Sequence, residues 1–143
     1  MYSDSDIGCT DSIACNYDPL AIIDDSSCII GNCVNNITQN TFYTTIQEAI
    51  NSSNVGDTNI VFDGRYFENI NFYGKNIVVA SQHFLDNDTT HIHNTIIDGS
   101  NNSAEYAVLF ENYEDTTAII SGFTIEHTGY TAIKISGSNS PNN

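Results

Sequence analysis

Chemistry in this chain would depend on scattered polar side chains and not on one compact motif. Only three residues are basic, Arg65, Lys75 and Lys134, against eighteen acidic ones. Lys134 alternates with isoleucines on a predicted strand, so its side chain is expected to point outward. No aspartate pair and no combination of an acid with arginine is identifiable for acid–base catalysis. We therefore predict that the chain is not an enzyme and has no catalytic residues. The acidic residues that would be candidates for acid–base catalysis are scattered along the chain: Asp98, Glu111, Glu114, Asp115 and Glu126.

Three histidines, His83, His91 and His93, lie in the polar run 82–94, which we predict to be a loop. The spacing of His91 and His93 would place two imidazoles on one side of an extended strand, a geometry that zinc or copper can use. Asp86, Asp88 or His83 would have to supply a third ligand. The other interpretation is that the histidines are polar residues of an exposed loop, and we favour it.

The charge of the chain excludes several classes of partner. The formal net charge of −15 disfavours nucleic acids and anionic membrane surfaces, which bind through lysine and arginine. It favours divalent cations or a basic partner. No run of residues is long and apolar enough to cross a bilayer, so we predict no membrane insertion.

All four cysteines, Cys9, Cys15, Cys28 and Cys33, fall in the first quarter of the chain. An even number of clustered cysteines in a segment with little apolar sequence predicts disulfides and an extracellular location. Two bridges allow three connectivities, and the sequence alone does not choose among them; we favour Cys9 with Cys28 and Cys15 with Cys33. A zinc site of four thiolates is the alternative, and the wide cysteine spacing disfavours it.

The cysteine segment, GCTDSIACNYDPLAIIDDSSC from Gly8 to Cys28, resembles a Cys- and Asp-rich repeat of secreted bacterial proteins with the pattern CTDxxAxNYxPxAxxDDGSC. The chain departs from that pattern at Ser26, where glycine is usual. Two interpretations of the oxygen-bearing side chains stay open: they bind calcium, or they cap turns and keep the surface soluble. The candidate calcium ligands are Asp11, Asn16, Asp18, Asp24 and Asp25.

Beyond this segment, we predict that the Asn- and Thr-rich residues 34–43 form a connection. The spacing of apolar residues then changes, first to that of a helix and afterwards to that of short strands. The run TIQEAI predicts a helix over about 45–52, with Thr44 or Thr45 as N-cap and Glu48 at the capping-box position. Short β-branched runs divided by turn residues then predict strand after strand. We therefore divide the chain into a disulfide-tied module, 1–34, and a β domain, 35–143.

The order of helix, GD, strand, GRYFENI and GKNI resembles the first turns of right-handed parallel β-helix proteins of the pectin-lyase-like class, over residues 41–143. The resemblance implies an all-β solenoid of about three coils, with the short helix capping its N-terminal end. It does not imply an activity, because proteins of this class include lyases, hydrolases, esterases and non-catalytic surface proteins.

The spacing of apolar runs supports a repeating structure. Val108 and Ile133 are 25 residues apart, and Ile70 and Val108 are 38 apart, which becomes 25 when the thirteen residues of the run 82–94 are subtracted. The last strand then leaves an open end, which favours pairing with further strands. We predict an assembly edge formed by Ile133, Lys134, Ile135 and Ser136.

These features favour a non-catalytic, secreted structural or adhesive module of the extracellular space or cell surface, assembling head-to-tail into a fibre. The expected partners are a second copy, a polymer, further coils or a polysaccharide. One alternative is the N-terminal part of a polysaccharide-active lyase, esterase or hydrolase; another is a calcium-dependent carbohydrate-binding module. Four Asn-x-Ser/Thr sequons mark possible glycosylation sites in a suitable host: Asn36, Asn51, Asn87 and Asn101.

Overall fold

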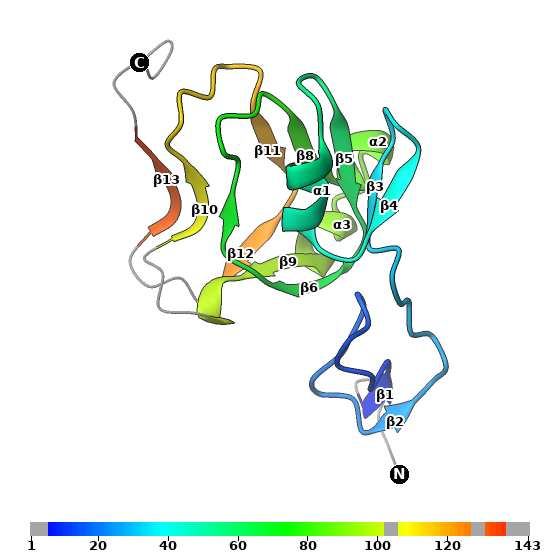
Figure 1. The fold of residues 1–143 in the computed structure, drawn as a ribbon. Helices are drawn as coiled ribbons and strands as arrows, with labels where there is room; N and C mark the ends of the chain where they lie inside the picture. The colour runs from blue at the N-terminus through cyan, green and yellow to red at the C-terminus, as the bar shows by residue number, and fades with distance from the viewer. Residues whose placement is uncertain (1–5, 102–105, 127–130, 137–143) are drawn as a thin grey trace.

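The computed structural model describes residues 6–101, 106–126 and 131–136. It contains a small N-terminal lobe, residues 6–33, and a larger β-rich body, residues 34–136, from which the lobe projects (Figure 1). In the lobe, β1 (Ile7–Gly8) pairs in parallel with β2 (Ile23–Asp24). Ser26 adopts a left-handed conformation with φ of 64°, so serine here takes the position at which glycine was expected.

Two disulfides hold the lobe together. Cys9 bonds to Cys28 and Cys15 bonds to Cys33, with Cα–Cα distances of 4.9 and 5.4 Å. This pairing confirms the favoured connectivity and overturns the zinc alternative, because a disulfide sulfur is not a thiolate ligand. Cys15 and Cys33 are both buried in the core cluster of the body. Cys33 directly precedes β3, so the second bridge fixes Cys15 of the lobe to the point at which the body begins.

The predicted helix is present as α1 (Ile46–Ser52), and its capping box is confirmed. The Thr45 hydroxyl accepts the Glu48 amide at 3.1 Å, and the Glu48 carboxylate accepts the Thr45 amide at 3.4 Å. Ile46, Ala49 and Ile50 are fully buried on one face. The helix thus packs its apolar stripe against the strands that follow it.

The strands of the body form three sheets, and from Thr58 onward the chain visits these sheets in a fixed order. The largest has the order β11-β8-β5-β3-β4; the other two are β12-β9-β6 and β13-β10-β7. Every pair is parallel except β3 with β4 and β3 with β5. The bounds are β3 (Val34–Asn36), β4 (Thr41–Tyr43), β5 (Thr58–Val61), β6 (Gly64–Phe67), β7 (Ile70–Asn71), β8 (Val78–Ser81), β9 (Thr95–Asp98), β10 (Tyr106–Phe110), β11 (Ile119–Ser121), β12 (Thr124–Glu126) and β13 (Thr131–Ile135).

The strand partners agree with the spacing of the apolar runs. Val108 on β10 lies opposite Ile70 on β7 and opposite Ile133 on β13. These are the pairs that the two separations of apolar runs had indicated. The apolar repeat therefore predicts which strands become neighbours.

The prediction of a three-coil β-helix is nevertheless wrong. The described strands fall into four separate small sheets of two to five strands, and the largest mixes parallel and antiparallel pairs. Residues 34–43, predicted as a connection, form the antiparallel strands β3 and β4. Many strands are only two to four residues long, because turn residues end them early, so matching periods do not make a continuous coil.

The predicted loop 82–94 is also wrong, because it contains two short helices, α2 (His83–Asp86) and α3 (Thr90–Asn94). Asn87 ends α2 in a left-handed conformation with φ of 61°. The Asp88 carboxylate accepts the Thr90 amide at 2.9 Å at the start of α3. His91 and His93 therefore lie two positions apart on a helix, where side chains do not share a face.

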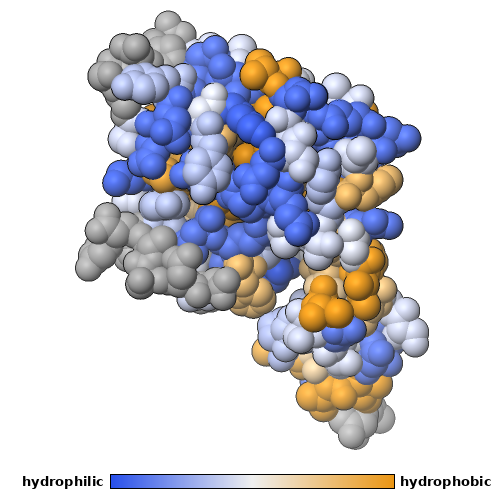
Figure 2. Space-filling model, viewed as in Figure 1, coloured by the Kyte–Doolittle hydropathy of each residue, from blue (hydrophilic) through white to orange (hydrophobic). Residues whose placement is uncertain are grey.

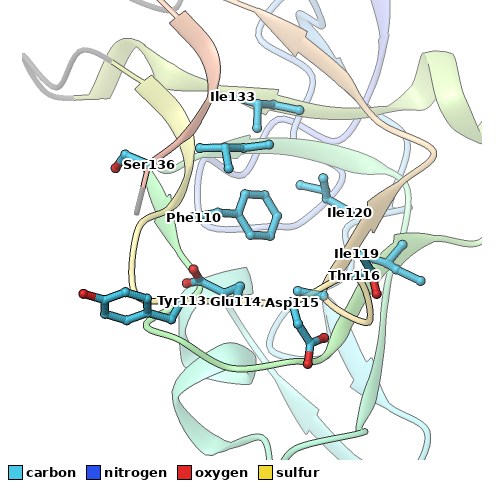
Figure 3. A pocket seen from close by; sticks show the side chains of 11 residues that line it. Phe110, Tyr113, Glu114, Asp115, Thr116, Ile119, Ile120, Ile133 and Ser136 are labelled. Carbon is cyan, nitrogen blue, oxygen red and sulfur yellow. The ribbon is translucent and has the colours of Figure 1, made fainter. Parts of the chain in front are cut away.

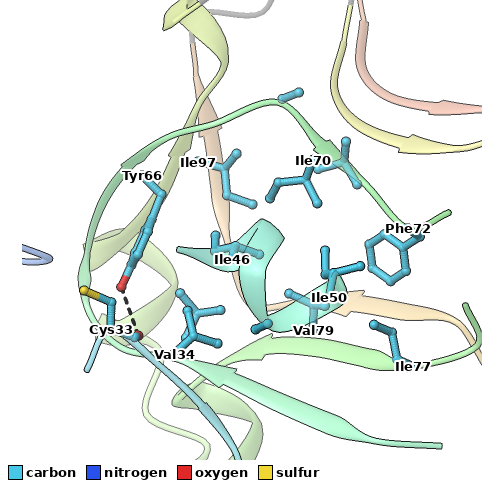
Figure 4. Packing of buried hydrophobic residues seen from close by; sticks show 14 of the residues in the cluster. Cys33, Val34, Ile46, Ile50, Tyr66, Ile70, Phe72, Ile77, Val79 and Ile97 are labelled. Carbon is cyan, nitrogen blue, oxygen red and sulfur yellow. Dashed lines mark hydrogen bonds between the residues drawn. The ribbon is translucent and has the colours of Figure 1, made fainter. Parts of the chain in front are cut away.

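The core lies between α1 and the three sheets (Figure 4). Phe72 is fully buried, and its ring centroid lies 4.2 Å from that of Phe110. The Tyr66 hydroxyl lies 2.7 Å from the Phe62 carbonyl and 3.2 Å from the Cys33 carbonyl, which anchors β6 beside the disulfide. Burial raises the pKa of Tyr66, so it stays a neutral donor. Other core residues are Val34, Ile46, Ile50, Ile70, Ile77, Val79 and Ile97.

Candidate functional site

The candidate site is an apolar hollow at the outer edge of the sheets. The outermost strands β11, β12 and β13, which we call the open edge, have no neighbour on one side among the described residues. A cavity of about 390 Å³ lies between β11 and β13, with the Phe110 ring at its centre (Figure 3). We call it the C-terminal hollow. Its lining residues are Phe110, Tyr113, Glu114, Asp115, Thr116, Ala118, Ile119, Ile120, Ile133, Ile135 and Ser136.

Three of the four residues of the predicted assembly edge line the C-terminal hollow: Ile133, Ile135 and Ser136. The fourth, Lys134, lies between them on β13 but does not line the hollow. Every residue of β13 is exposed, and Ile135 is 68 % exposed. An exposed isoleucine pair on an outermost strand is unusual, because such edges promote association. This edge is therefore a candidate interaction surface.

The backbone of β13 leaves hydrogen-bonding groups on its free side. The Ser136 amide donates to the Phe110 carbonyl at 2.8 Å, so this amide faces β10. Backbone directions alternate along a strand, and the amides of Ile133 and Ile135 therefore face away from β10. No described strand pairs with that side.

The rim of the hollow is acidic. Glu114 is buried, and its carboxylate accepts the Gly74 amide at 2.8 Å and the Asn112 amide at 3.0 Å. Asp115 is exposed, and hydrogen bonds from the side chain and the backbone amide of Thr117 lower its pKa. Asp115 is therefore ionised at neutral pH, and the apolar hollow is bordered by negative charge.

The opposite end of the sheets is closed by α1. The Gln47 side chain accepts the Asn71 amide at 2.8 Å and donates to the Asn71 carbonyl at 2.9 Å, which occupies the free side of β7. The Glu68 carboxylate accepts the Ile46 and Gln47 amides at 3.0 Å each. Burial raises the pKa of Glu68, although these two amides oppose that shift. Lys75 binds the last carbonyls of α1, those of Ile50, Asn51 and Ser53, at 2.7–2.9 Å. At the other end, β11, β12 and β13 have no neighbour on their outer side among the described residues.

An acid–arginine cluster is present, which the sequence reasoning missed. Arg65 Nη1 lies 2.8 Å from Asp98 Oδ2 and 2.9 Å from Glu126 Oε2. These residues come from β6, β9 and β12, which are adjacent in one sheet. Burial lowers the pKa of Arg65, but the hydrogen bonds that Arg65 donates to Glu126 and Asp98 outweigh this effect, so the net shift of its pKa is upward. The strand register brings together residues 33 and 61 positions apart, and no local motif signals this.

The cluster has the geometry of a structural ion pair. The Asp98 side chain is only 4 % exposed, so a polymeric substrate has little access to it. Arg65 Nη1 contacts one oxygen of each carboxylate, so the two ion pairs join β6, β9 and β12. The remaining acids considered for catalysis are separate: Glu114 and Asp115 border the hollow, and Glu111 is exposed.

His91 ties the helical insert to the body. Its Nδ1 lies 2.6 Å from Asp63 Oδ1 in the β5–β6 turn, and its Nε2 lies 3.0 Å from Asp86 Oδ2. The hydrogen bond with Asp63 is the largest cause of a raised His91 pKa. His93 is exposed on the same helix. Within the described part of the chain, no group of three His, Cys, Asp or Glu side chains is placed to hold a metal ion.

The His91 link predicts a pH-dependent insert. A raised folded-state pKa means that the link is complete below the unfolded pKa and is lost as the pH rises through the folded pKa. Amide exchange, corrected for intrinsic rates, gives the free energy of local opening of residues 83–94. We expect this free energy to fall relative to that of the core between about pH 5.5 and about pH 8.5, by at most about 1 kcal/mol. His91→Asn should abolish this dependence and His93→Asn should keep it. An unchanged profile in His91→Asn would refute the link.

The candidate calcium ligands in the lobe act as turn caps. The carboxylate of each aspartate accepts a backbone amide two residues further on: Asp11 from Ile13, Asp18 from Leu20, Asp24 from Ser26 and Asp25 from Ser27. Asn16 bridges two backbone groups, the Ser27 carbonyl and the Ile29 amide, at 2.8 Å each. These contacts fit the turn-capping interpretation, and calcium binding stays a prediction.

The sequons differ in accessibility. Asn36 is fully buried, and its side chain donates to Asp57 at 2.9 Å and accepts the Gln39 amide at 3.0 Å, so a glycan there is incompatible with this fold. Asn51 and Asn87 are exposed. The side chain of Asn101 lies outside the described residues.

A second cavity, of about 410 Å³, lies between the lobe and the body. Tyr17 and Asp18 of the lobe line it, facing Asp63, Arg65 and His93 of the body. The lobe also carries exposed apolar residues, seen as orange surface in Figure 2. Among these, Ile13, Leu20 and Ile22 are at least 66 % exposed.

Comparisons with protein-family models, curated proteins and solved structures found no match to this chain. The resemblances to the pectin-lyase-like class and to the Cys- and Asp-rich repeat therefore stay predictions from the sequence. Of the helices in the described ranges, none combines the length and the apolar character needed to span a bilayer.

Proposed function

We propose that the protein is a non-catalytic structural or adhesive module of the extracellular space or cell surface, and that it acts by binding another polypeptide at the open edge. The observation that carries the proposal is the C-terminal hollow, in which Ile133 and Ile135 of an outermost strand stay exposed beside the Phe110 ring. Covering such a surface is favourable because it removes apolar area from water and satisfies free backbone groups.

The contrast between the two ends of the body supports this function. At one end, Gln47 of α1 binds the free backbone groups of Asn71 on β7, and Glu68 accepts the first amides of α1. At the other end, β11, β12 and β13 have no outer neighbour among the described residues. The two disulfides support an extracellular location, since such bonds persist in oxidising compartments. A head-to-tail fibre is the less favoured form of assembly, because Gln47 of α1 occupies the free side of β7 at the other end of the sheets, where β4 and β6 are the remaining outer strands.

The alternative with a specific observation behind it is a polysaccharide-active protein. Arg65, Asp98 and Glu126 lie on one sheet, close to the cavity between lobe and body that Arg65 also lines. Carboxylates grouped with a cation are the residue types that such reactions use. A calcium-dependent carbohydrate-binding module is a further form of this alternative, with Asp18 at the same cavity.

One pair of assays separates these functions. We expect the purified chain to cleave neither polygalacturonate nor alginate, with calcium or with EDTA, as measured by unsaturated products and reducing ends. Calcium-dependent cleavage that disappears in Arg65→Met and persists in Lys75→Met would contradict the non-catalytic proposal. A melting temperature lowered by EDTA would support the calcium role, and an unchanged one would remove it.

A further inference from the structure

The free side of β13 has the properties of a template for an incoming strand. The ladder with β10 is continuous, with Val108 opposite Ile133 and Phe110 opposite Ile135. The Ile133 and Ile135 amides face away from β10, as the Ser136 to Phe110 hydrogen bond requires. An extended segment could therefore add to the sheet through backbone hydrogen bonds without displacing a described strand.

The C-terminal hollow supplies a place for side chains of that segment. It is lined mainly by apolar groups of β11, β13 and Phe110, and its volume of about 390 Å³ is sufficient for a large side chain. Side chains alternate between the two faces of a strand. A bound segment would thus place every second side chain toward the hollow and the others toward solvent.

The charges around the open edge select the chemistry of the segment. Glu114 and Asp115 line the hollow, Glu111 is exposed directly after β10, and the whole chain carries a formal charge of −15. Lys134 is the only basic residue of β13. A second copy would bring the same acidic rim and the same net charge, and would be repelled, whereas a basic segment would be attracted.

We propose that the open edge binds an extended, cationic segment of another polypeptide, which pairs with β13 and places an apolar side chain in the C-terminal hollow. This inference rests on the proposed function and names the kind of partner that it needs. The pairing supplies affinity through the backbone, the hollow selects apolar side chains, and the acidic rim excludes anionic segments.

The direct test uses synthetic peptides of about six residues, a typical strand length, with capped ends. The first peptide alternates lysine with valine, the second replaces every lysine by glutamate, and the third is the lysine peptide with a central proline. Binding to the whole protein is measured by NMR titration. We expect the lysine peptide to bind, with affinity falling as NaCl rises from about 0.05 M to about 0.5 M, and the other two peptides to bind at least about tenfold more weakly.

Variants locate the binding on the protein. Ile135→Ser should weaken binding of the lysine peptide about tenfold or more, whereas Ile22→Ser on the N-terminal lobe, where isoleucine is 66 % exposed compared with 68 % at Ile135, should leave it unchanged. Lys134→Glu should strengthen binding several-fold, because it adds an acid without altering the hollow. Thr131→Pro removes one free-side amide and should weaken binding, while Thr131→Val keeps that amide and the affinity.

Each outcome decides a separate claim. Equal binding of the lysine and glutamate peptides, or loss of binding in Ile22→Ser but not in Ile135→Ser, would overturn the inference. Sedimentation of the protein alone as a dimer or fibre that Ile135→Ser dissociates would also overturn it, but would keep the proposed function with a second copy as the partner. A monomer that binds none of the peptides would overturn both.

Discussion

Phe72→Ala is expected to lower the free energy of unfolding by about 3–5 kcal/mol, the usual cost of truncating a fully buried phenylalanine. Phe72 is 0 % exposed, and its ring lies 4.2 Å from Phe110, centroid to centroid. Truncation would leave a cavity between β7 and the hollow that Phe110 lines. Urea denaturation followed by circular dichroism measures the effect as a shift in midpoint at constant slope.

The matched control for this substitution is Phe84→Ala. Phe84 lies on α2 and is 47 % exposed, so the same truncation should cost much less. Equal losses in the two variants would show that Phe72 is not a core residue. A much larger loss in Phe72→Ala than in Phe84→Ala would show that Phe72 packs in the core.

Removal of the Cys15–Cys33 bridge by a double serine substitution is expected to cost about 3 kcal/mol, from the loop that the bridge closes in the unfolded chain. The sequence separation is 18 residues. Both cysteines are also buried, at 4 % and 2 % exposure, within the core of the body. The loss should therefore be visible in the unfolding of the whole body, measured by thermal denaturation and by core amide exchange.

The Cys9–Cys28 bridge provides the control, because its separation of 19 residues gives nearly the same loop entropy. Cys28 lies outside the core cluster, so its removal should loosen the lobe while core amide exchange in the body stays slow. If both double variants destabilise the body equally, the bridge at Cys15 does not couple the lobe to the core.

Local sequence chemistry predicted the parts of this structure that depend on neighbouring residues. The Thr45 and Glu48 capping box and the opposition of Ile70, Val108 and Ile133 follow from a short pattern and from regular spacing. The clustered cysteines predicted two disulfides, whereas their pairing was a preference that the sequence alone did not decide. Three residues of the predicted assembly edge line the hollow. They belong to the last strand that the regular spacing of apolar runs predicts.

Other features depend on contacts that short patterns do not encode. Arg65 meets Asp98 and Glu126 only because three parallel strands have a particular register. The helices of 83–94 have no side-chain hydrogen bond at their N-cap residues, and the turn between them uses Asn87 in a left-handed conformation and an Asp88 carboxylate that accepts the Thr90 amide. Such polar residues are equally typical of a loop. The prediction of a continuous coil was wrong because the spacing of apolar residues indicates only which strands become neighbours. How the strands divide into sheets depends on the length of each strand and on the β3–β4 hairpin.

In the proposed complex, the acidic rim and Lys134 would set the charge preference of the open edge. A charged residue on an outermost strand discourages pairing with indiscriminate neighbours. Lys134 disfavours cationic partners locally, but the acids beside the hollow and the net charge of −15 act over the whole approach path. An increased affinity of Lys134→Glu for the lysine peptide would show that Lys134 weakens the attraction of the open edge for cationic segments.

The most direct measurement of the central claim is amide exchange of residues 131–136 with and without the lysine–valine peptide. We expect the Ile133 and Ile135 amides, which face the free side, to exchange at least about tenfold more slowly on binding. The Lys134 amide, which faces β10, should change much less. Unchanged exchange at Ile133 and Ile135, or protection that appears only in the N-terminal lobe, would contradict the claim that the open edge is the binding surface.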